Sequence, residues 1–354
     1  MKVLMVSDMI MHGGAKHTKL VTEGLRRKGV DVEIASYSKA SGLKDIPSIS
    51  LPSIFYKLCT DKKRFAEILN ESRPDIVHMH HCAGSLELMA DKLKAAGMAV
   101  VGTVHISPGG DKPVDRMIEL YFRRFLSKNL RIADKTICVS RYVEKKINRI
   151  GVHNTQTIYN GIDPETIFRV PGARSILGIP DDEKALLYVG RLSPEKGIGM
   201  LLKAFKRLRG KKLYIVGSGP MERICRSYAR QNRNVVFAGK VEERDLRLYY
   251  SAADLTIVPS TWNEAFGMVN IESMRCGTPP VASALGAMPE IVDDGRNGFL
   301  VRDISPEGFA ERISEAFGSD LERIGRNGER FVGKRFFWDS IAGQTKKVYE
   351  SALS

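Results

Sequence analysis

Residues 2–36 read KVLMVSDMIMHGGAKHTKLVTEGLRRKGVDVEIAS and contain one complete strand–helix–strand unit. The apolar runs Lys2–Val6 and Val30–Ser36 have the length and composition of buried strands. Between them, Ala15–Lys28 carries its apolar residues at helical spacing. Because parallel strands need a crossover helix of this kind, the stretch predicts a parallel α/β sheet.

The same alternation continues along the chain with one interruption. Glycine and proline punctuate residues 164–182, which predicts a linker. A chain of 354 residues has room for two domains. We therefore expect two doubly wound α/β domains in tandem. Further strands are predicted at Asp75–His80, Val100–His105, Thr136–Val139, Ala185–Val189, Lys212–Val216, Val235–Ala238, Leu255–Val258, Pro280–Ala282 and Gly298–Val301, and further helices at Lys62–Glu71 and Leu86–Ala96.

The composition is that of a globular protein with excess positive charge. Hydrophobic residues make up 43% and charged residues 27%, which argues against extended disorder. The formal net charge of +14 indicates an anionic partner. Five cysteines without a CxxC pair favour a reducing compartment over a disulfide framework. No signal peptide or membrane-spanning run is recognisable, so we expect a cytoplasmic protein.

Residues 112–149 hold the densest positive charge, with 11 basic and 4 acidic side chains and a net charge of +7. Their apolar residues alternate with cations such as Arg123, Arg124 and Lys128 at near-helical spacing. Two interpretations stay open: a basic helix on an anionic lipid surface, or a domain helix whose apolar stripe packs on the core. No nucleic-acid-binding motif accompanies the charge, so we expect no nucleic-acid partner.

Residues 263–272 read NEAFGMVNIE and contain two carboxylates, Glu264 and Glu272. A continuous helix would separate them by about 12 Å along its axis. The catalytic carboxylates of glycoside hydrolases lie roughly 5–9.5 Å apart. The spacing therefore favours contacts with two ends of one elongated ligand over a hydrolytic pair. Two exposed glutamates on a surface helix would give the same pattern.

Residues 190–197 read GRLSPEKG and directly follow a predicted strand. Arg191 offers a planar donor fork for phosphate oxygens, and Lys196 a compact positive charge. Gly13 and Gly14 follow the first strand, where a glycine pair lets the backbone approach a phosphate or sugar. A solvated turn explains each feature equally well. The incomplete GxGxxG pattern gives little support to a hydride-transfer enzyme.

Several histidines and one cysteine invite sharper interpretations. His78 and His80 would share one face of a strand, which allows two metal ligands. No further cysteine or histidine at suitable spacing completes a zinc site, so we expect no metal. For His17, beside the glycine pair, contact with an acceptor and plain solvent exposure both stay open, as they do for His12. Cys276 is expected to be a small buried hydrophobe rather than a reactive thiol.

In this order, the features resemble the retaining GT-B glycosyltransferases of family 4, also described as glycosyl transferases group 1. The resemblance runs along most of the chain and rests on the ordered set rather than on one motif. The set comprises Gly13-Gly14, His105, Val139-Ser140, Asn160-Gly161-Ile162-Asp163, Arg191 with Lys196, Gly217-Ser218-Gly219-Pro220, Ala253-Asp254, Pro259-Ser260, Glu264 with Glu272, Cys276-Gly277-Thr278-Pro279, Asp294-Gly295-Arg296-Asn297-Gly298 and Phe337-Trp338.

The resemblance implies two Rossmann-like domains facing an interdomain cleft. Residues 1–165 would bind the acceptor, residues 166–334 would bind a nucleotide sugar, and the helix at 335–354 would pack back on the first domain. The implied reaction moves a sugar from a nucleotide diphosphate sugar to an acceptor hydroxyl with retained configuration, by a front-face mechanism without metal or other cofactor. The lack of a DxD motif agrees with metal independence.

The resemblance also implies roles for single residues. Arg191 and Lys196 would neutralise the leaving diphosphate. Glu264 would hold hydroxyls of the transferred sugar, Glu272 would hold the ribose, and His105 would reach the sugar from the N-terminal domain. The backbone groups expected to approach the donor are those of Gly13, Gly14, Gly267, Met268 and Val269.

The chain departs from the family pattern at a few positions. Ala287 stands where many members have a second glycine, and Ser273 and Arg275 stand where alanine is common, which puts sugar selection in doubt. Two alternatives are kept: a nucleotide-sugar epimerase of the same architecture, and a non-catalytic basic membrane-binding module. The base, sugar and acceptor are not specified. The charge at 112–149 favours a lipid-linked or otherwise anionic acceptor and peripheral contact with the cytosolic membrane face.

Overall fold

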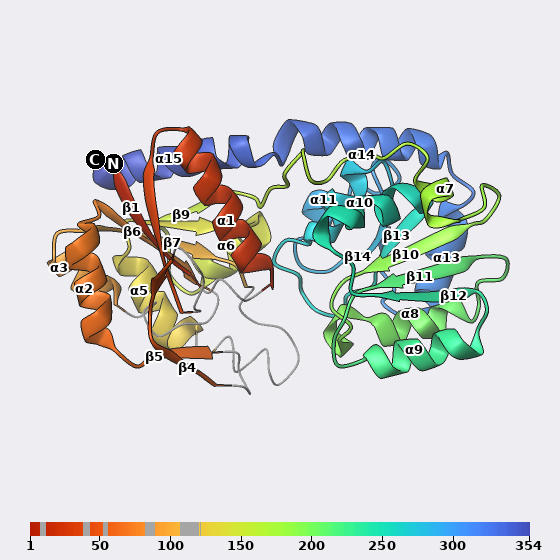
Figure 1. Cartoon of the computed structure of the whole chain (residues 1–354), viewed down its shortest axis with the longest axis horizontal. Helices are drawn as coiled ribbons and strands as arrows, with labels where there is room; N and C mark the ends of the chain where they lie inside the picture. Colours follow the sequence, from red (N-terminus) through yellow and green to blue (C-terminus); the bar gives the residue numbers. More distant parts are fainter. Residues whose placement is uncertain (8–11, 38–42, 52–55, 82–88, 107–119, 121) are drawn as a thin grey trace. The chain divides into compact units, whose positions relative to one another are not determined.

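The structure, a computed structural model, describes residues 1–7, 12–37, 43–51, 56–81, 89–106, 120 and 122–354. The chain forms two compact units (Figure 1). Unit 1 comprises Met1–Gly161 with Trp338–Ser354, and unit 2 comprises Ile162–Phe337. These boundaries differ by a few residues from those expected after positions 165 and 334. The reason is that Ile162 bridges to Phe337 and its amide donates to the Phe336 carbonyl at 2.7 Å.

Unit 1 is built on a seven-stranded parallel sheet in the order β3-β2-β1-β6-β7-β8-β9. Chain order runs outward in opposite directions from β1, which pairs with both β2 and β6. This reversal is the topological switch point of a Rossmann-like sheet. The strands are β1 (Lys2–Ser7), β2 (Asp31–Ser36), β3 (Lys44–Asp45), β6 (Ile76–His81), β7 (Ala99–Val104), β8 (Lys135–Cys138) and β9 (Thr155–Thr157).

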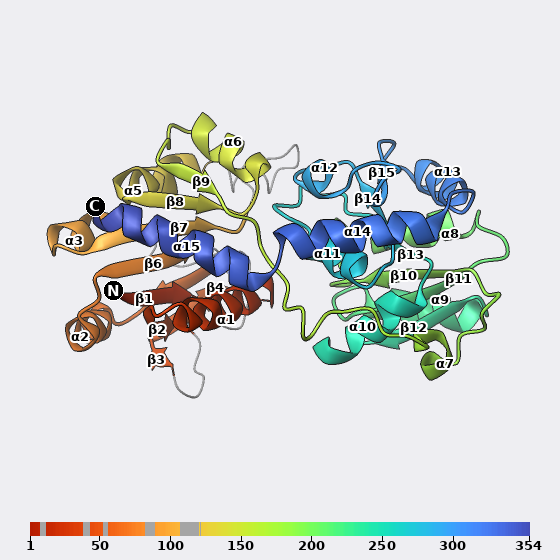
Figure 2. The ribbon, with the colours of Figure 1, turned by 90° about the horizontal axis from the view of Figure 1, so that it is seen from above.

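Helices cover both faces of this sheet because neighbouring residues of each strand point to opposite sides. Val3 packs on one face with α1 (His12–Arg27) and α15 (Trp338–Leu353), while Leu4 packs on the other with α2 (Lys62–Ser72) and α3 (Ala90–Ala95). Figure 2 shows α15 running beside α1. The two helices approach closely at Gly24, where a β-carbon would lie 2.6 Å from the β-carbon of Ala342.

Unit 2 repeats the architecture with a six-stranded parallel sheet in the order β12-β11-β10-β13-β14-β15. Its switch point lies between β10 and β13. The strands are β10 (Ala185–Val189), β11 (Lys212–Val216), β12 (Val235–Gly239), β13 (Leu255–Val258), β14 (Pro280–Ser283) and β15 (Phe299–Val301). The helices are α7 (Ala173–Leu177), η3 (Pro194–Lys196), α8 (Ile198–Phe205), α9 (Glu222–Gln231), α10 (Glu243–Ala252), α11 (Met268–Arg275), α12 (Met288–Ile291), α13 (Pro306–Ala316) and α14 (Leu321–Arg335).

The structure confirms the doubly wound α/β prediction and each predicted strand, with ends shifted by a residue or two. Among the features that were not predicted are the short strands β3 and β9, the antiparallel pair β4 (Ser48–Leu51) and β5 (Tyr56–Cys59), and α7 inside the predicted linker. Ser140 of the Val139-Ser140 motif is the N-cap of α6 (Arg141–Arg149), where its hydroxyl accepts from the Val143 amide at 3.1 Å.

The helix expected at Ala15–Lys28 begins earlier, at His12. Gly13 and Gly14 therefore lie in the first turn of α1 and not in a turn before it. The first amides of a helix have no intrahelical partner, and glycines at this position carry no side chain that would cover them.

The basic segment is described only in part, since residues 107–119 and 121 lie outside the described structure. From Phe122 the chain is helical, as η2 (Phe122–Leu126) followed by α5 (Ser127–Ile132). Leu126 and Leu130 are buried, whereas Arg123 and Arg124 are exposed. This portion has the arrangement expected of a domain helix. No helix within the described ranges is long and apolar enough to cross a membrane.

Candidate functional site

Two loops at the switch point of unit 2 bring a predicted cation and a predicted carboxylate together. Lys196 follows β10 and Glu264 follows β13, and these two strands are hydrogen-bonded neighbours. The Lys196 ammonium donates to Glu264 Oε1, and the Ser260 hydroxyl donates to the same oxygen at 2.6 Å. Open parallel sheets bind ligands beyond the carboxyl ends of their strands at such a point.

Glycines allow the surrounding loops to touch. Gly197 has a φ of +71°, and a β-carbon there would lie 1.7 Å from the Pro259 carbonyl oxygen. Gly217, in the turn after β11, would place a β-carbon 1.9 Å from the Gly190 carbonyl oxygen. The GSGP turn, the Arg191–Lys196 segment and the loop after β13 therefore pack directly on one another. Any side chain larger than hydrogen at these glycines would separate them.

The N-terminus of α11 lies in the same loop region, directly after Glu264. Gly267 caps the helix with a φ of +89°, and Met268 is its first residue. The Asn270 amide nitrogen donates back to the Gly267 carbonyl at 3.2 Å, while its buried Oδ1 has no hydrogen-bond partner within the described ranges. The backbone at Gly267–Val269 therefore presents helix N-terminal amides, the groups that bind anions.

Glu272 lies within α11 and is only 6% exposed. The Tyr250 hydroxyl donates to Glu272 Oε2 at 2.9 Å. Burial, together with the neighbouring carboxylate, raises the pKa of Tyr250 well above its ordinary value, so the hydroxyl stays a donor. Glu264 precedes the helix, so the 12 Å estimate for a continuous helix does not apply to this pair. Neither Tyr250 nor Ser260 was predicted as a partner of these carboxylates.

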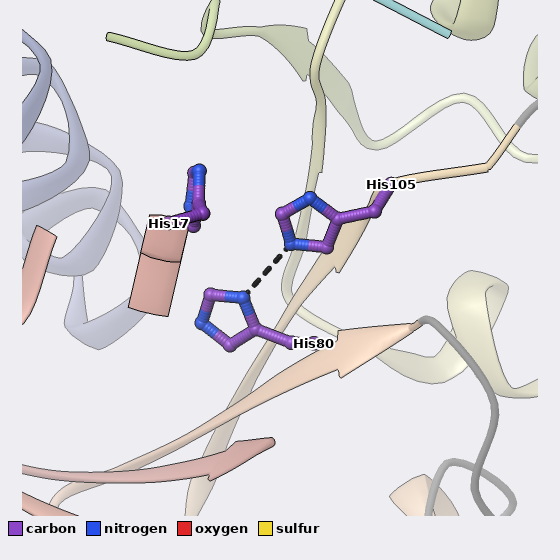
Figure 3. A group of neighbouring side chains, drawn as sticks. All are labelled: His17, His80 and His105. Atoms are coloured by element: carbon purple, nitrogen blue, oxygen red, sulfur yellow. Dashed lines mark hydrogen bonds between the residues drawn. The ribbon is translucent and has the colours of Figure 1, made fainter. Parts of the chain in front are cut away.

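Three histidines gather at the carboxyl ends of adjacent strands in unit 1 (Figure 3). His80 lies near the end of β6, His105 directly follows β7, and His17 comes from α1, which follows β1. His80 Nδ1 is 2.9 Å from His105 Nε2. The sequence singled out His105 alone as a sugar contact. His17 and His80 lie beside His105 because β1, β6 and β7 are neighbours in the sheet.

The surroundings of His17 determine its tautomer and its protonation state. Its Nδ1 donates to Asn160 Oδ1 at 2.8 Å, since a carbonyl oxygen can only accept. Its ring meets the Trp338 ring edge-on with centroids 4.9 Å apart. Burial lowers the pKa of His17 to about 4, an effect that the Asn160 hydrogen bond only partly opposes, so the ring is neutral at pH 7.

The structure also places His78 and Cys276, which the sequence singled out. His78 shares a face with His80 as predicted, with ring centroids 4.5 Å apart, but its nitrogens contact the Tyr349 hydroxyl at 2.6 Å and the Thr103 hydroxyl at 2.7 Å. Cys276 is buried, as predicted, and burial raises its pKa to about 12. The side chains of His12 and His81 lie outside the described structure.

Two family models match the chain: the one described as glycosyl transferases group 1 over residues 171–331, and glycosyltransferase family 4 over residues 11–166. An uncharacterized glycosyltransferase of Methanocaldococcus jannaschii is 30% identical over 398 residues, an alignment covering 100% of this chain and 99% of that one. The chain belongs to the group 1 glycosyltransferases. Another glycosyltransferase of the same organism is 26% identical over 99% of this chain and 98% of its own.

Solved structures show that this glycosyltransferase has the GT-B fold. Sucrose-phosphate synthase from Thermosynechococcus elongatus superposes with a TM-score of 0.80 at 24% identity, over 99% of this chain and 98% of the other. Anabaena HepE, solved in complex with UDP-glucose, gives a TM-score of 0.77 at 21% identity, over 99% and 100%. At these sequence identities, the structural similarity shows the fold and nothing further.

In this group 1 glycosyltransferase, the predicted site residues fall into one group per unit. Lys196, Glu264 and the N-terminus of α11 share the carboxyl edge of the unit 2 sheet, with the exposed Arg191 in the same loop as Lys196. His105 lies at the carboxyl edge of the unit 1 sheet. Gly13 and Gly14 follow β1 of that sheet, in the first turn of α1.

Proposed function

We propose that this glycosyltransferase moves a hexose from a nucleoside diphosphate sugar to an acceptor hydroxyl, with retained anomeric configuration and without a metal ion. The observation that carries the proposal is the contact of Lys196 with Glu264 at the switch point of unit 2. This contact would place a cation for the departing phosphate beside a carboxylate for sugar hydroxyls. The UDP-glucose complex of Anabaena HepE supports a nucleotide-sugar donor.

Each donor group has a chemical counterpart in unit 2. Arg191 and Lys196 would neutralise the negative charge that develops on the departing diphosphate. The amides at Gly267–Val269 would bind phosphate or sugar oxygens at the start of α11. Glu264 would accept hydrogen bonds from hydroxyls of the transferred sugar. Glu272, whose carboxylate is oriented by Tyr250, would accept those of the ribose.

The reaction breaks the bond between the anomeric carbon and the β-phosphate oxygen. The acceptor oxygen forms its bond on the same face of the sugar, and its proton passes to the departing phosphate oxygen. Cations that stabilise this oxygen lower the barrier because its negative charge is larger in the transition state than in the bound donor. His105 would contact the transferred sugar, and the backbone of Gly13 and Gly14 would approach the donor.

For the acceptor, we propose an anionic or lipid-linked hydroxyl compound. The support is the net charge of +7 over residues 112–149 and the exposure of Arg123 and Arg124 in its described part. Such a segment would hold the enzyme at the cytosolic face of an anionic membrane, where a lipid-linked acceptor would lie.

A thermal-shift screen with UDP-, GDP- and ADP-sugars tests the donor, because ligand binding raises the unfolding temperature by mass action. The anomeric configuration of the product, read by NMR after incubation with donor and acceptor, tests retention. Turnover undiminished by chelators tests metal independence. Formation of an epimerised sugar nucleotide without transfer would replace the proposal with the epimerase. A chain that binds no nucleoside diphosphate would be a non-catalytic module.

A further inference from the structure

The histidine cluster of unit 1 has a property that sugar binding does not require. One ring nitrogen from each of His17, His80 and His105 lies within 4.8 Å of the other two. Figure 3 shows the three rings next to one another, contributed by α1 and by the ends of β6 and β7. His17 and His80 are buried and His105 is partly buried.

The ring spacing is that of imidazoles around one metal ion. The centroid of the His17 ring lies 4.6 Å from that of His105 and 5.3 Å from that of His80, and the latter two centroids are 5.2 Å apart. Three imidazoles bound tetrahedrally to zinc, with nitrogens about 2.0–2.1 Å from the metal, have ring centres roughly 5 Å apart. A metal would therefore require reorientation of the rings within the cluster but little displacement of their centres.

Asn160 gives the cluster a second feature of a built metal site. Its Oδ1 accepts from His17 Nδ1 at 2.8 Å, which leaves the lone pair of that ring on Nε2. Histidines that bind metals commonly donate their other ring N–H to such an oxygen, which fixes both tautomer and orientation. The edge-on contact with Trp338 further restricts rotation of the His17 ring.

We propose that His17, His80 and His105 bind one divalent transition-metal ion of the zinc type, leaving a fourth position for water or another oxygen ligand. His80 Nδ1 and His105 Nε2 share one proton across 2.9 Å when no metal is bound. When the metal binds, the ring that carries this proton changes tautomer, so that the proton lies on the nitrogen facing away from the other ring. Both facing nitrogens, His80 Nδ1 and His105 Nε2, can then coordinate the ion. This site uses none of the unit 2 cations assigned to the diphosphate, and it shares His105 with the proposed sugar contact.

The test uses the whole chain and Co²⁺ alone. We expect one equivalent of Co²⁺ to bind with visible d–d absorption, and Zn²⁺ to displace it. His17→Ala and His105→Ala should each weaken binding at least 100-fold, and Asn160→Ala about 10–100-fold. His153→Ala is the matched control, since His153 is an exposed histidine of the same unit outside the cluster, and it should bind as the parent does.

X-ray absorption of the Zn²⁺-loaded parent keeps the test independent of how the variants fold. Three imidazoles at about 2.0–2.1 Å support the site. Fewer than three, or Co²⁺ binding unchanged in both His17→Ala and His105→Ala, would overturn it and leave His80 and His105 as a hydrogen-bonded pair. Because binding is read without turnover, failure here leaves the proposed transferase activity intact, and absence of transfer leaves the metal site intact.

Discussion

Gly197 shows how one residue fixes the position of Lys196, the cation that we propose for the departing diphosphate. It follows Lys196 directly, and a β-carbon there would overlap the Pro259 carbonyl oxygen. Gly197→Ala should lower the free energy of unfolding of unit 2 by at least about 3 kcal/mol, because left-handed strain adds to a backbone clash. Gly210→Ala is the control: it has a similar φ, +65°, but nothing within 4 Å, and should cost about 1 kcal/mol. Hydrogen exchange of β10 and β13 measures the free energy of unfolding of both variants. Equal losses of stability in the two variants would rule out the clash.

Lys196 itself is the residue whose removal should affect transfer most directly. Its side chain is not buried, so Lys196→Ala should fold, while kcat/KM falls by about 10²–10³-fold through lost stabilisation of the leaving diphosphate. Lys203→Ala removes an exposed lysine from α8 and should leave the kinetics unchanged. Steady-state kinetics with the donor identified by thermal shift measure kcat/KM for both variants. Near-parental turnover of Lys196→Ala would remove this lysine from the site.

At the scale of elements, Glu33 ties three strands to a helix. The carboxylate, on β2, accepts from the Ser72 hydroxyl at the end of α2 and pairs with Lys2 of β1 and Lys44 of β3. Burial alone would raise the pKa of Glu33, but the Ser72 hydrogen bond and the two lysines outweigh it and lower the pKa to about 2. Because the folded pKa lies below the unfolded one, the stabilisation is complete above about pH 4.5 and is lost as the pH falls toward 2.

Glu33→Gln should therefore destabilise unit 1 more at pH 6 than at pH 3.5, with the difference between parent and variant shrinking by about 1 kcal/mol. Urea unfolding at the two pH values, followed by hydrogen exchange of β1 and β2, measures this. Glu67→Gln serves as the comparison, since Glu67 is exposed on α2 and its ion pair in the described structure is with Arg64. A difference independent of pH would mean that the carboxylate charge contributes nothing.

The described part of the basic segment, η2 and α5, yields a prediction about membranes. If Arg123 and Arg124 face lipid phosphates, reversing both to glutamate should weaken partitioning onto anionic vesicles at least about 30-fold, from about 1 kcal/mol per basic residue. Lys206→Glu with Arg209→Glu makes the same change of net charge on exposed positions of unit 2. Sedimentation with phosphatidylglycerol vesicles compares the two. A parent chain that stays in solution would establish the domain-helix interpretation.

The elements also show how far the sequence could predict the structure. Apolar runs such as Ala185–Val189 identify buried strands because nearly all of their side chains are hydrophobic and are more stable away from water. Thr155–Thr157 has no such run, and its strand exists only because β8 offers an open edge. The contacts of Lys196 with Glu264, and of His80 with His105, depend on which strands are neighbours. Strand order is a property of the assembled sheet, so the sequence predicted these residues but not their partners.

At the scale of the whole molecule, unit 1 is discontinuous in sequence because α15 returns to it after unit 2 is complete. This helix supplies buried side chains to the unit 1 core, among them Trp338 and Ile341, and its Tyr349 hydroxyl contacts His78. Each such large side chain contributes a few kcal/mol, and the total stability of a domain is about 5–15 kcal/mol. Unit 1 should therefore not fold without α15.

A chain ending at Phe337 should lose hydrogen-exchange protection throughout residues 2–161, whereas the strands from β10 to β15 stay protected. Removing only Leu353 and Ser354 is the control, since both are exposed and their loss should leave both units folded. Donor nucleotide should still raise the unfolding temperature of unit 2 in the shortened chain, because the proposed diphosphate and ribose contacts belong to that unit. Protection retained over β1, β6 and β7 would show that α15 merely covers a core that the rest of unit 1 completes.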